Sequence, residues 1–319
     1  MDAVVDIKNL TKKYGGFVAL DNLSLTLQRG SILGFIGPNG AGKTTTIRIL
    51  VGQSRPTSGS AMIAGADCVR DSRKTKRLVG YMPDSFGSYD NMRVREYLDF
   101  FGAAFEIPRA ARKLRIEAVM ETTGCTYMKD RYVEGLSHGM KQRVGIARTL
   151  LHDPEVLILD EPANGLDPQA RIEMRTILLR LAEMGKTLIV TSHILPELSR
   201  ICDQVAILVG GRLRAYGTVQ EVMHSVSQER TIEIQMIASD QFMQSVELIR
   251  RMLGPEEEVT SSATEAIVRF RTRKSEEDLA KLLASLSQAR VIFSQFRELQ
   301  SDLEDTFLSI ASSHEQSNY

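Results

Sequence analysis

The segment that constrains the fold most is GPNGAGKT, residues 37–44 of the 319-residue chain. It fits the pattern G-x-x-x-x-G-K-[S/T], follows the apolar run SILGFI and leads into the helical run TTTIRILVG. Glycines let the backbone turn tightly and bring its N–H groups near a polyphosphate, and the positive end of the next helix adds to the attraction. The order strand, loop, helix predicts an α/β fold with a phosphate-binding loop. An ordinary glycine-rich turn is the alternative.

The side chains of this phosphate loop have separate expected roles. We expect Lys43 to place its charge on the β- and γ-phosphates, the Thr44 hydroxyl to bind Mg²⁺, and Thr45 to support the phosphates. The other loop residues expected to bind the nucleotide are Gly37, Pro38, Asn39, Gly40, Ala41 and Gly42.

An acidic pair and a histidine follow two other apolar runs. Asp160 ends the run VLIL, and open α/β sheets bind ligands at the C-terminal ends of their strands. We expect Asp160 to hold Mg²⁺ through water, and Glu161 to orient or deprotonate the water that attacks the γ-phosphate. His193, after TLIVTS, is expected to hydrogen-bond a γ-phosphate oxygen. The alternatives are a plain strand end for the pair and a structural role for the histidine.

The segment LSHGMKQR opens another predicted helix. Ser137 can cap this helix and leave N–H groups and the positive dipole end pointing outward, while Gly139 permits close approach of the backbone. An apolar stripe anchors the helix and consists of Met140, Val144, Ala147 and Leu151. Taken alone, the segment favours a plain capped core helix over an anion site.

The remaining pattern predicts two domains. Short strands come first, helical patterns dominate between Arg93 and Leu181, and QVAILVGGRLRAYGT predicts a hairpin that turns at Gly210 and Gly211. The continuous apolar runs favour a parallel sheet covered on both faces. Residues 228–319 read βαββαβ, the order of a ferredoxin-like α+β fold, and a further helix is predicted in LEDTFLSIASS.

In order, the phosphate loop, LSHGMKQR, LILDEP, ANGLD and TSH resemble the ATP-binding subunit of an ABC transporter, over roughly residues 4–217. GYMPD, PANGLDP and the ending LEDTFLSI resemble export-type systems whose membrane domains are separate chains. The resemblance implies a P-loop NTPase of the ABC type, with a mixed sheet core and a helical subdomain. We expect an ATP-binding domain at residues 1–220, with its helical subdomain at about 90–150, and a smaller accessory or regulatory domain at 228–319.

The same resemblance assigns roles to single residues. Tyr14 matches the aromatic residue that stacks on adenine, although a surface tyrosine in a turn is the alternative. Asp84 falls where the family usually has a glutamine that touches Mg²⁺ or the attacking water; an aspartate can also ligate Mg²⁺ but is shorter and charged. Asp167 matches the aspartate of a loop that crosses between subunits. His138 and Met140 replace the usual glycine and glutamine of the family's signature sequence.

The resemblance also implies partners. In this family two nucleotide domains pair head to tail, and each ATP lies between one subunit's phosphate loop and the other's signature sequence. With one of each, this chain is expected to pair with a second copy of itself and to drive export through separate transmembrane permease subunits. Phe86 and Tyr89 are expected permease contacts. The expected location is cytoplasmic and peripheral, on the cytoplasmic face of the cell membrane.

Composition adds exclusions. Forty basic and forty acidic residues give a net charge of zero, so no nucleic-acid or anionic membrane partner is expected, and the basic run RDSRKTKR is interpreted as a solvated face. No apolar segment approaches the roughly 18 residues of a spanning helix, and the N-terminus lacks the apolar block of a signal peptide. Cys68, Cys125 and Cys202 are expected to be reduced core residues of a cytosolic protein.

Two other functions compete with transport. A soluble ABC ATPase that acts on ribosomes or DNA usually carries two cassettes or a long coiled-coil insertion, and the sequence shows neither. A binding module without hydrolysis is disfavoured by the joint presence of Lys43, Thr44, Asp160 and Glu161. Drugs, ions, lipids and glycans are equally compatible as cargo, because a motor subunit does not contact it.

Overall fold

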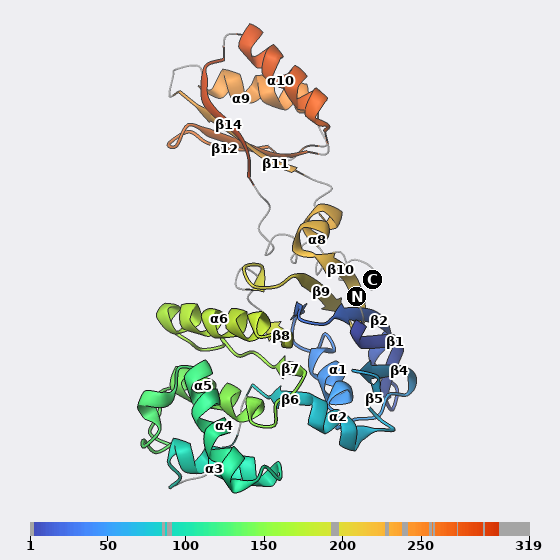
Figure 1. The fold of residues 1–319 in the computed structure, drawn as a ribbon. Coiled ribbons are helices and arrows are strands. Elements are labelled where there is room, and N and C mark those ends of the chain that lie inside the picture. Colours follow the sequence, from blue (N-terminus) through green and yellow to red (C-terminus); the bar gives the residue numbers. More distant parts are fainter. Residues whose placement is uncertain are drawn as a thin grey trace. The chain divides into compact units, whose positions relative to one another are not determined.

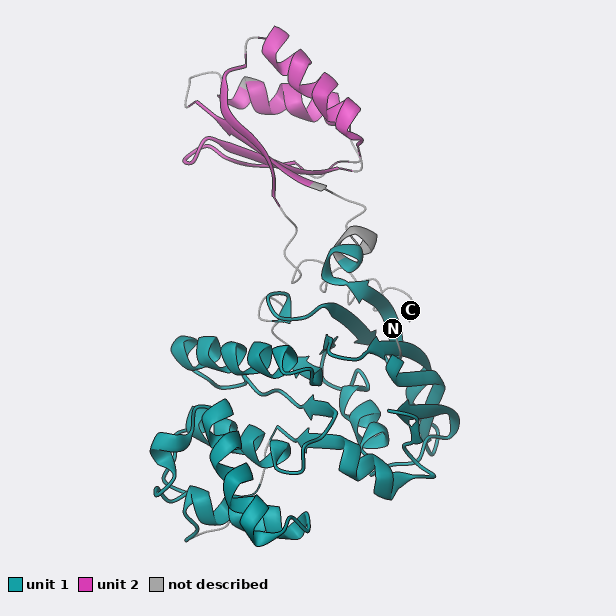
Figure 2. Ribbon diagram, viewed as in Figure 1, with its two compact units in different colours: residues 1–222 teal, residues 223–319 magenta. Residues whose placement is uncertain are grey.

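The computed structural model forms two compact units, Met1–Val222 and Met223–Tyr319 (Figures 1 and 2). We call them the N-terminal and C-terminal units and describe each by itself. The residues described are 3–84, 87, 91–192, 198–226, 230–237, 242–254, 257, 259–272, 274–289 and 291–299.

The N-terminal unit is built on a six-stranded sheet in the order β10-β9-β3-β8-β7-β6. Its strands are β3 (Ile32–Ile36), β6 (Val79–Met82), β7 (Val156–Leu159), β8 (Thr187–Ser192), β9 (Gln204–Val209) and β10 (Arg212–Thr218). All pairs are parallel except β9 with β10, so the sheet is mixed. Every residue of β3, β7 and β8 is buried, as expected of strands covered on both faces.

A second, antiparallel sheet has the order β2-β1-β4-β5. Its strands are β1 (Ala3–Tyr14), β2 (Phe17–Gln28), β4 (Ser58–Ile63) and β5 (Ala66–Asp67). Along β2, Leu23, Leu25 and Leu27 are buried and the residues between them are exposed. The alternation confirms the predicted half-buried strand, and these leucines join a core that includes residues of β3 and α1 (Lys43–Leu50).

Helices fill most of the chain between β6 and β8. They are α3 (Val94–Ala104), α4 (Arg109–Thr122), the 3₁₀ turn η1 (Thr126–Met128), α5 (His138–Leu150) and α6 (Pro168–Glu183). This confirms the predicted helical region, and β9 and β10 confirm the predicted hairpin. Outside it, the described residues form α1 and two further short helices, α2 (Ser72–Leu78) and α8 (Val219–Val226). α2 carries the basic run on exposed side chains, as the solvated-face interpretation requires.

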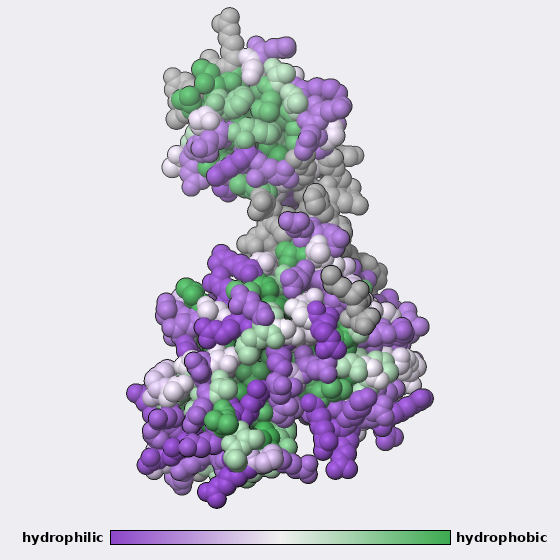
Figure 3. Space-filling view, in the orientation of Figure 1, coloured by the Kyte–Doolittle hydropathy of each residue, from purple (hydrophilic) through white to green (hydrophobic). Residues whose placement is uncertain are grey.

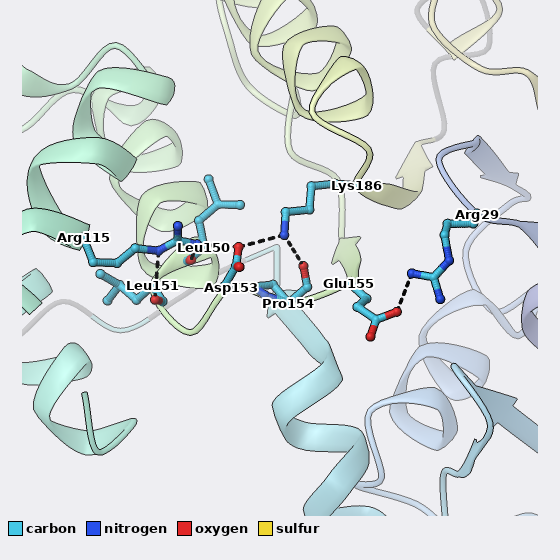
Figure 4. Close-up of polar contacts among 8 residues, drawn as sticks. All are labelled: Arg29, Arg115, Leu150, Leu151, Asp153, Pro154, Glu155 and Lys186. Carbon is cyan, nitrogen blue, oxygen red and sulfur yellow. Dashed lines mark hydrogen bonds and ion pairs between the residues drawn. The ribbon is translucent and has the colours of Figure 1, made fainter. Parts of the chain in front are cut away.

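Two basic side chains from other parts of the chain hold the turn between α5 and β7 in place (Figure 4). Arg115 of α4 donates to the carbonyl oxygens of Leu150 at 2.6 Å and Leu151 at 3.1 Å, and to Asp153 Oδ1 at 2.8 Å. Lys186, just before β8, donates to the same Asp153 oxygen at 2.8 Å. The hydrogen bond from Lys186 lowers the pKa of Asp153, and Arg115 contributes in the same direction. We call LSHGMKQR, residues 136–143, the signature segment. The turn therefore fixes α5, which begins within this segment, relative to β7, which the acidic pair follows.

The C-terminal unit has the predicted βαββαβ order. Its elements are β11 (Arg230–Met236), α9 (Phe242–Leu253), β12 (Val259–Ser262), β13 (Ile267–Thr272), α10 (Glu276–Gln288) and β14 (Phe293–Leu299). The antiparallel sheet has the order β12-β13-β11-β14, which is ferredoxin-like, and both helices pack through apolar side chains on one face of it (Figure 1). The helix predicted in LEDTFLSIASS lies outside the described residues.

The cysteines and the surface agree with the composition. Cys68, Cys125 and Cys202 are free and buried, which confirms the core interpretation, and burial raises the pKa of the Cys68 thiol to about 12. In the view of Figure 3 the surface of the N-terminal unit is largely hydrophilic. None of the described helices combines the length and the apolar character needed to cross a membrane.

Candidate functional site

One pocket of about 330 Å³ in the N-terminal unit brings together most of the predicted site residues. It lies beyond the C-terminal ends of β3 and β7, the edge where open α/β sheets bind ligands. The lining residues are Tyr14, Phe17, Ala19, Pro38, Asn39, Gly40, Ala41, Gly42, Lys43, Thr44, Thr45, Asp84, Asp160 and Glu161.

The phosphate loop needs its glycines for two different reasons. Gly40 and Gly42 have φ angles of +81° and +105°, in the region that favours glycine. Gly37 has no such angle, but a Cβ there would lie 2.5 Å from the carbonyl oxygen of Leu208. The loop thus packs against β9 through Gly37 and turns through Gly40 and Gly42, and α1 begins directly after it at Lys43.

Lys43 is a buried cation that faces two carboxylates. Its side chain is 7% exposed, and its ammonium donates to the carbonyl oxygens of Gly37 and of Pro38, the latter at 3.3 Å. Burial lowers the pKa of Lys43, while the charges of Glu161 and Asp160 act in the opposite direction. A triphosphate entering this pocket would meet a desolvated charge, which attracts an anion more strongly than a charge in water does.

Thr191 on β8 organises the acidic pair. Its hydroxyl donates to Asp160 Oδ1 at 2.6 Å and accepts the backbone N–H of Glu161 at 2.9 Å. Glu161 has a φ of +51°, an uncommon backbone conformation for a residue with a side chain. Thr191 was not predicted from the sequence, although it belongs to TLIVTS, the apolar run that precedes His193.

Three predicted metal ligands, Thr44, Asp84 and Asp160, line the same pocket. All three offer oxygen atoms, which Mg²⁺ prefers. Among the described residues no three His, Cys, Asp or Glu side chains could hold a metal ion by themselves. This donor set therefore fits Mg²⁺ that completes its shell with phosphate oxygens and water, as is usual for Mg²⁺ at nucleotide sites.

Two aromatic rings stand at the mouth of the pocket. Tyr14 is 48% exposed, and the Lys12 ammonium lies 4.7 Å from the centroid of its ring. Phe17 pairs with Tyr14 across the tight turn between β1 and β2 and is 65% exposed. Phe17 was not predicted from the sequence, although it follows Tyr14 by three residues around a Gly-Gly turn. Both rings line the pocket.

The start of α5 lies elsewhere in the unit. Ser137 Oγ accepts the backbone N–H of Met140 at 3.4 Å, which confirms the predicted cap. A Cβ at Gly139 would lie 3.3 Å from the Cβ of Ala170, so this glycine has a packing role inside its own chain. Asp167 caps α6 and accepts the Ala170 N–H at 2.9 Å.

Ser137, Gly139 and Asp167 are not among the residues that line the pocket of their own chain. His193, Phe86 and Tyr89 lie outside the described residues.

Comparison with known proteins decides the family. A family model described as "ABC transporter" matches residues 20–164. "Nod factor export ATP-binding protein I" of Cupriavidus metallidurans is 34% identical over 310 residues, which cover 97% of this chain and 98% of that protein. The chain belongs to the family of ABC transporter ATP-binding proteins.

Other members of the ABC family agree with this assignment. An uncharacterised ABC transporter ATP-binding protein of Synechocystis sp. is 42% identical over 207 residues, 64% of this chain; the chain spans 58% of that relative's length. The solved structure of cbiO1 from Clostridium perfringens, part of the ABC transporter complex cbiONQ, has a TM-score of 0.64 at 28% identity. The match covers 71% of this chain and 95% of that one and confirms the predicted ABC ATPase fold.

Proposed function

We propose that the protein is the ATP-hydrolysing subunit of an ABC exporter. The observation that carries the proposal is the meeting of Lys43, Asp160 and Glu161 in one pocket with the phosphate loop. Export is supported by the name of the Cupriavidus metallidurans relative, which the chain matches along nearly its whole length. Work through permease subunits is supported by the similarity to cbiO1, which is itself part of a transporter complex.

ATP binding divides between backbone and side chains. The backbone N–H groups of residues 39–45, which include the start of α1, hold the phosphates, and Lys43 neutralises the β- and γ-phosphates. Tyr14 stacks on the adenine. Thr44, Asp160 and Asp84 would hold Mg²⁺, which when bound neutralises phosphate charge as it develops.

Hydrolysis depends on Glu161. Its carboxylate orients a water molecule toward the γ-phosphorus and accepts a proton as the new P–O bond forms. The bond between the γ-phosphorus and the bridging β,γ-oxygen breaks, and ADP and phosphate result. Phosphoryl transfer has a loose transition state, so positioning and charge stabilisation by Lys43 supply most of the catalysis. From its place in the sequence, we assign His193 to the γ-phosphate as a sensor of ATP against ADP.

The complete site requires a second copy of the chain. Ser137 and Gly139 lie outside the pocket of their own chain but at a helix start that suits a phosphate. In a head-to-tail pair they would contact the γ-phosphate of the partner's ATP, with Asp167 in the loop that crosses between subunits. ATP then stabilises the closed pair, and hydrolysis releases it.

We assign separate roles to the two domains of the chain. Residues 1–220 form the ATP-binding domain, in which about 90–150 is the helical subdomain, and residues 228–319 form an accessory or regulatory domain. Phe86 and Tyr89 would contact separate permease subunits, which would hold the protein on the cytoplasmic face of the membrane.

Complementation between two inactive variants tests the composite site. Lys43→Ala disables the phosphate loop, and Ser137→Arg blocks the signature segment while leaving ATP binding by the monomer intact. Each variant alone should show no turnover. An equal mixture should recover up to roughly a quarter of wild-type ATPase activity, because half of the pairs contain one intact site.

The absence of recovery, with both variants folded and paired, would contradict the head-to-tail site. Ser137→Ala removes the helix cap without adding bulk, at a cost of about 1 kcal/mol in the free energy of unfolding. Its unfolding curve measures the part of the Ser137→Arg effect that is due to the cap.

A further inference from the structure

His138, in the middle of the signature segment, contacts the loop that follows the acidic pair in the same chain. Its Nε2 lies 2.9 Å from the carbonyl oxygen of Asn164, a normal hydrogen-bond distance. Because a carbonyl oxygen only accepts, Nε2 carries the proton. Gly165, with a φ of +68°, follows directly, and a Cβ there would lie 3.6 Å from the same ring nitrogen. The imidazole therefore rests against this loop.

Gln142, one turn further along α5, lies beside the same ring nitrogen. It is 2% exposed, its Nε2 lies 3.4 Å from His138 Nε2, and its Oε1 has no partner among the described residues. Two N–H donors cannot bond each other. Exchanging the amide oxygen and nitrogen, which are almost equal in size, gives the Nε2 proton of His138 a second acceptor and satisfies the buried oxygen.

Asn164 connects this contact to the pocket. Its side-chain amide donates to Asp84 Oδ1 at 3.5 Å, and its backbone N–H donates to the carbonyl oxygen of Glu161 at 3.1 Å. Asp84 and Glu161 both line the pocket. One residue thus contacts two pocket residues on one side and His138 on the other.

We infer that His138 is a positioning residue that ties the signature segment of a chain to that chain's own ATP pocket. The inference rests on the proposed function, in which the signature segment acts on the partner's ATP while Asp84 and Glu161 act on the chain's own. The His138–Asn164–Asp84 contact then couples the two ATP sites of a pair, since a shift of either end moves the other. Glycine, the usual residue at this place in the family, has no side chain to make the contact.

A structural role alone is the competing explanation. In that case His138 would contribute to the free energy of unfolding but would not change how one site responds to the other. The experiment must therefore measure the cooperativity of ATP hydrolysis, because a purely structural contact does not change it.

Two substitutions separate these explanations. His138→Gly removes the donor, whereas His138→Gln keeps an N–H near the position of Nε2. The ATP dependence of hydrolysis is measured for wild type and both variants. We expect His138→Gly to lower the Hill coefficient from the wild-type value to about 1, with unchanged ATP affinity of the monomer, and His138→Gln to preserve cooperativity. An unchanged Hill coefficient in a folded His138→Gly variant, or a wild-type coefficient of 1, would overturn the inference.

A double-mutant cycle tests whether Asn164 and His138 act through the same contact. Asn164→Ala cuts the contact with Asp84 and should lower the Hill coefficient as His138→Gly does, and the double variant should lose no more than either single one. If the decreases in the Hill coefficient of the two single variants added up in the double variant, the two residues would act independently, and this would overturn the coupling. Failure of the proposed function is distinguishable, because wild-type protein would then show no pairing and no ATPase activity.

Discussion

The hydroxyl of Thr191 donates a 2.6 Å hydrogen bond to the carboxylate of Asp160. The donor lies on β8 and the acceptor follows β7, so the parallel pairing of these strands sets the position of the acid. The same hydroxyl accepts the N–H of Glu161 and thereby supports the left-handed backbone of that residue. One buried side chain holds both members of the acidic pair.

We predict that Thr191→Val lowers kcat more than it changes KM. Valine has nearly the same shape, so the buried site stays filled, but Asp160 loses its donor and the Glu161 N–H loses its acceptor. A buried group left without its partner costs about 1–3 kcal/mol, which corresponds to roughly 5- to 150-fold in kcat if it falls on the transition state. Steady-state ATPase kinetics over a range of Mg²⁺ concentrations measure this decrease in kcat. Thr191→Ser, which keeps the hydroxyl, is the control, and wild-type kcat in Thr191→Val would contradict the assignment.

Glu161→Gln should trap an ATP-bound pair. Glutamine keeps the size of the side chain but cannot accept the proton, so we expect turnover to fall by about 10²- to 10⁴-fold while ATP still binds. ATPase rate and molecular mass in solution are measured together. Glu155→Gln, just before β7 and outside the pocket, is the matched control, and it should leave both unchanged. Normal turnover by a folded Glu161→Gln protein would remove Glu161 from the mechanism.

Substitutions can show which of the two aromatic residues stacks on adenine. If Tyr14 stacks on adenine, Tyr14→Ala removes about 1–3 kcal/mol of binding and raises the Kd for ATP by roughly 5- to 150-fold, whereas Tyr14→Phe changes it little. Titration with a fluorescent ATP analogue gives each Kd. Phe17→Ala is compared in the same assay, and a loss confined to Phe17→Ala would transfer the stacking role to that residue.

Local patterns account for what the sequence could predict. The phosphate loop is contiguous, and its glycines, lysine and threonine act within residues 37–44. The strands and helices of the C-terminal unit follow from the change between alternating and helical periodicity. Each of these features depends on neighbours along the chain.

The missed residues depend on contacts between distant segments. Thr191 bonds Asp160 across 31 positions, and Asn164 bonds Asp84 across 80. A threonine in a strand and an asparagine in a loop are common, and only the folded sheet places them at the pocket. Phe17 was missed for another reason, because an aromatic residue at the start of a strand is usually part of a core.

An ion-paired carboxylate in the C-terminal unit gives a prediction about pH. Glu233 lies in β11 between two buried neighbours that face the helices, so its own side chain is on the opposite face. It is only 1% exposed, because Arg269 at 2.6 Å and Arg297 at 2.5 Å cover it from the strands on either side. Burial alone would raise the pKa of Glu233, but the hydrogen bonds from Arg269 and Arg297 outweigh it, and the net shift is downward.

The sign of the pH effect follows from this shift. An unfolded glutamate has a pKa of about 4.3, and the folded pKa of Glu233 is lower. The stabilisation from ionised Glu233 is therefore complete above the unfolded pKa and is lost as the pH falls through the folded pKa. We predict that Glu233→Gln lowers the free energy of unfolding by about 1.5–3 kcal/mol at neutral pH, and that the gap to wild type narrows below about pH 4. Urea unfolding at several pH values measures the difference in free energy of unfolding, and amide hydrogen exchange in β11 localises it.

Glu247→Gln is the control, since Glu247 and Arg251 form an exposed pair at 3.9 Å that should contribute about 0–1 kcal/mol. A gap that widens toward acid, or equals that of Glu247→Gln, would show that the two arginines do not hold Glu233 ionised.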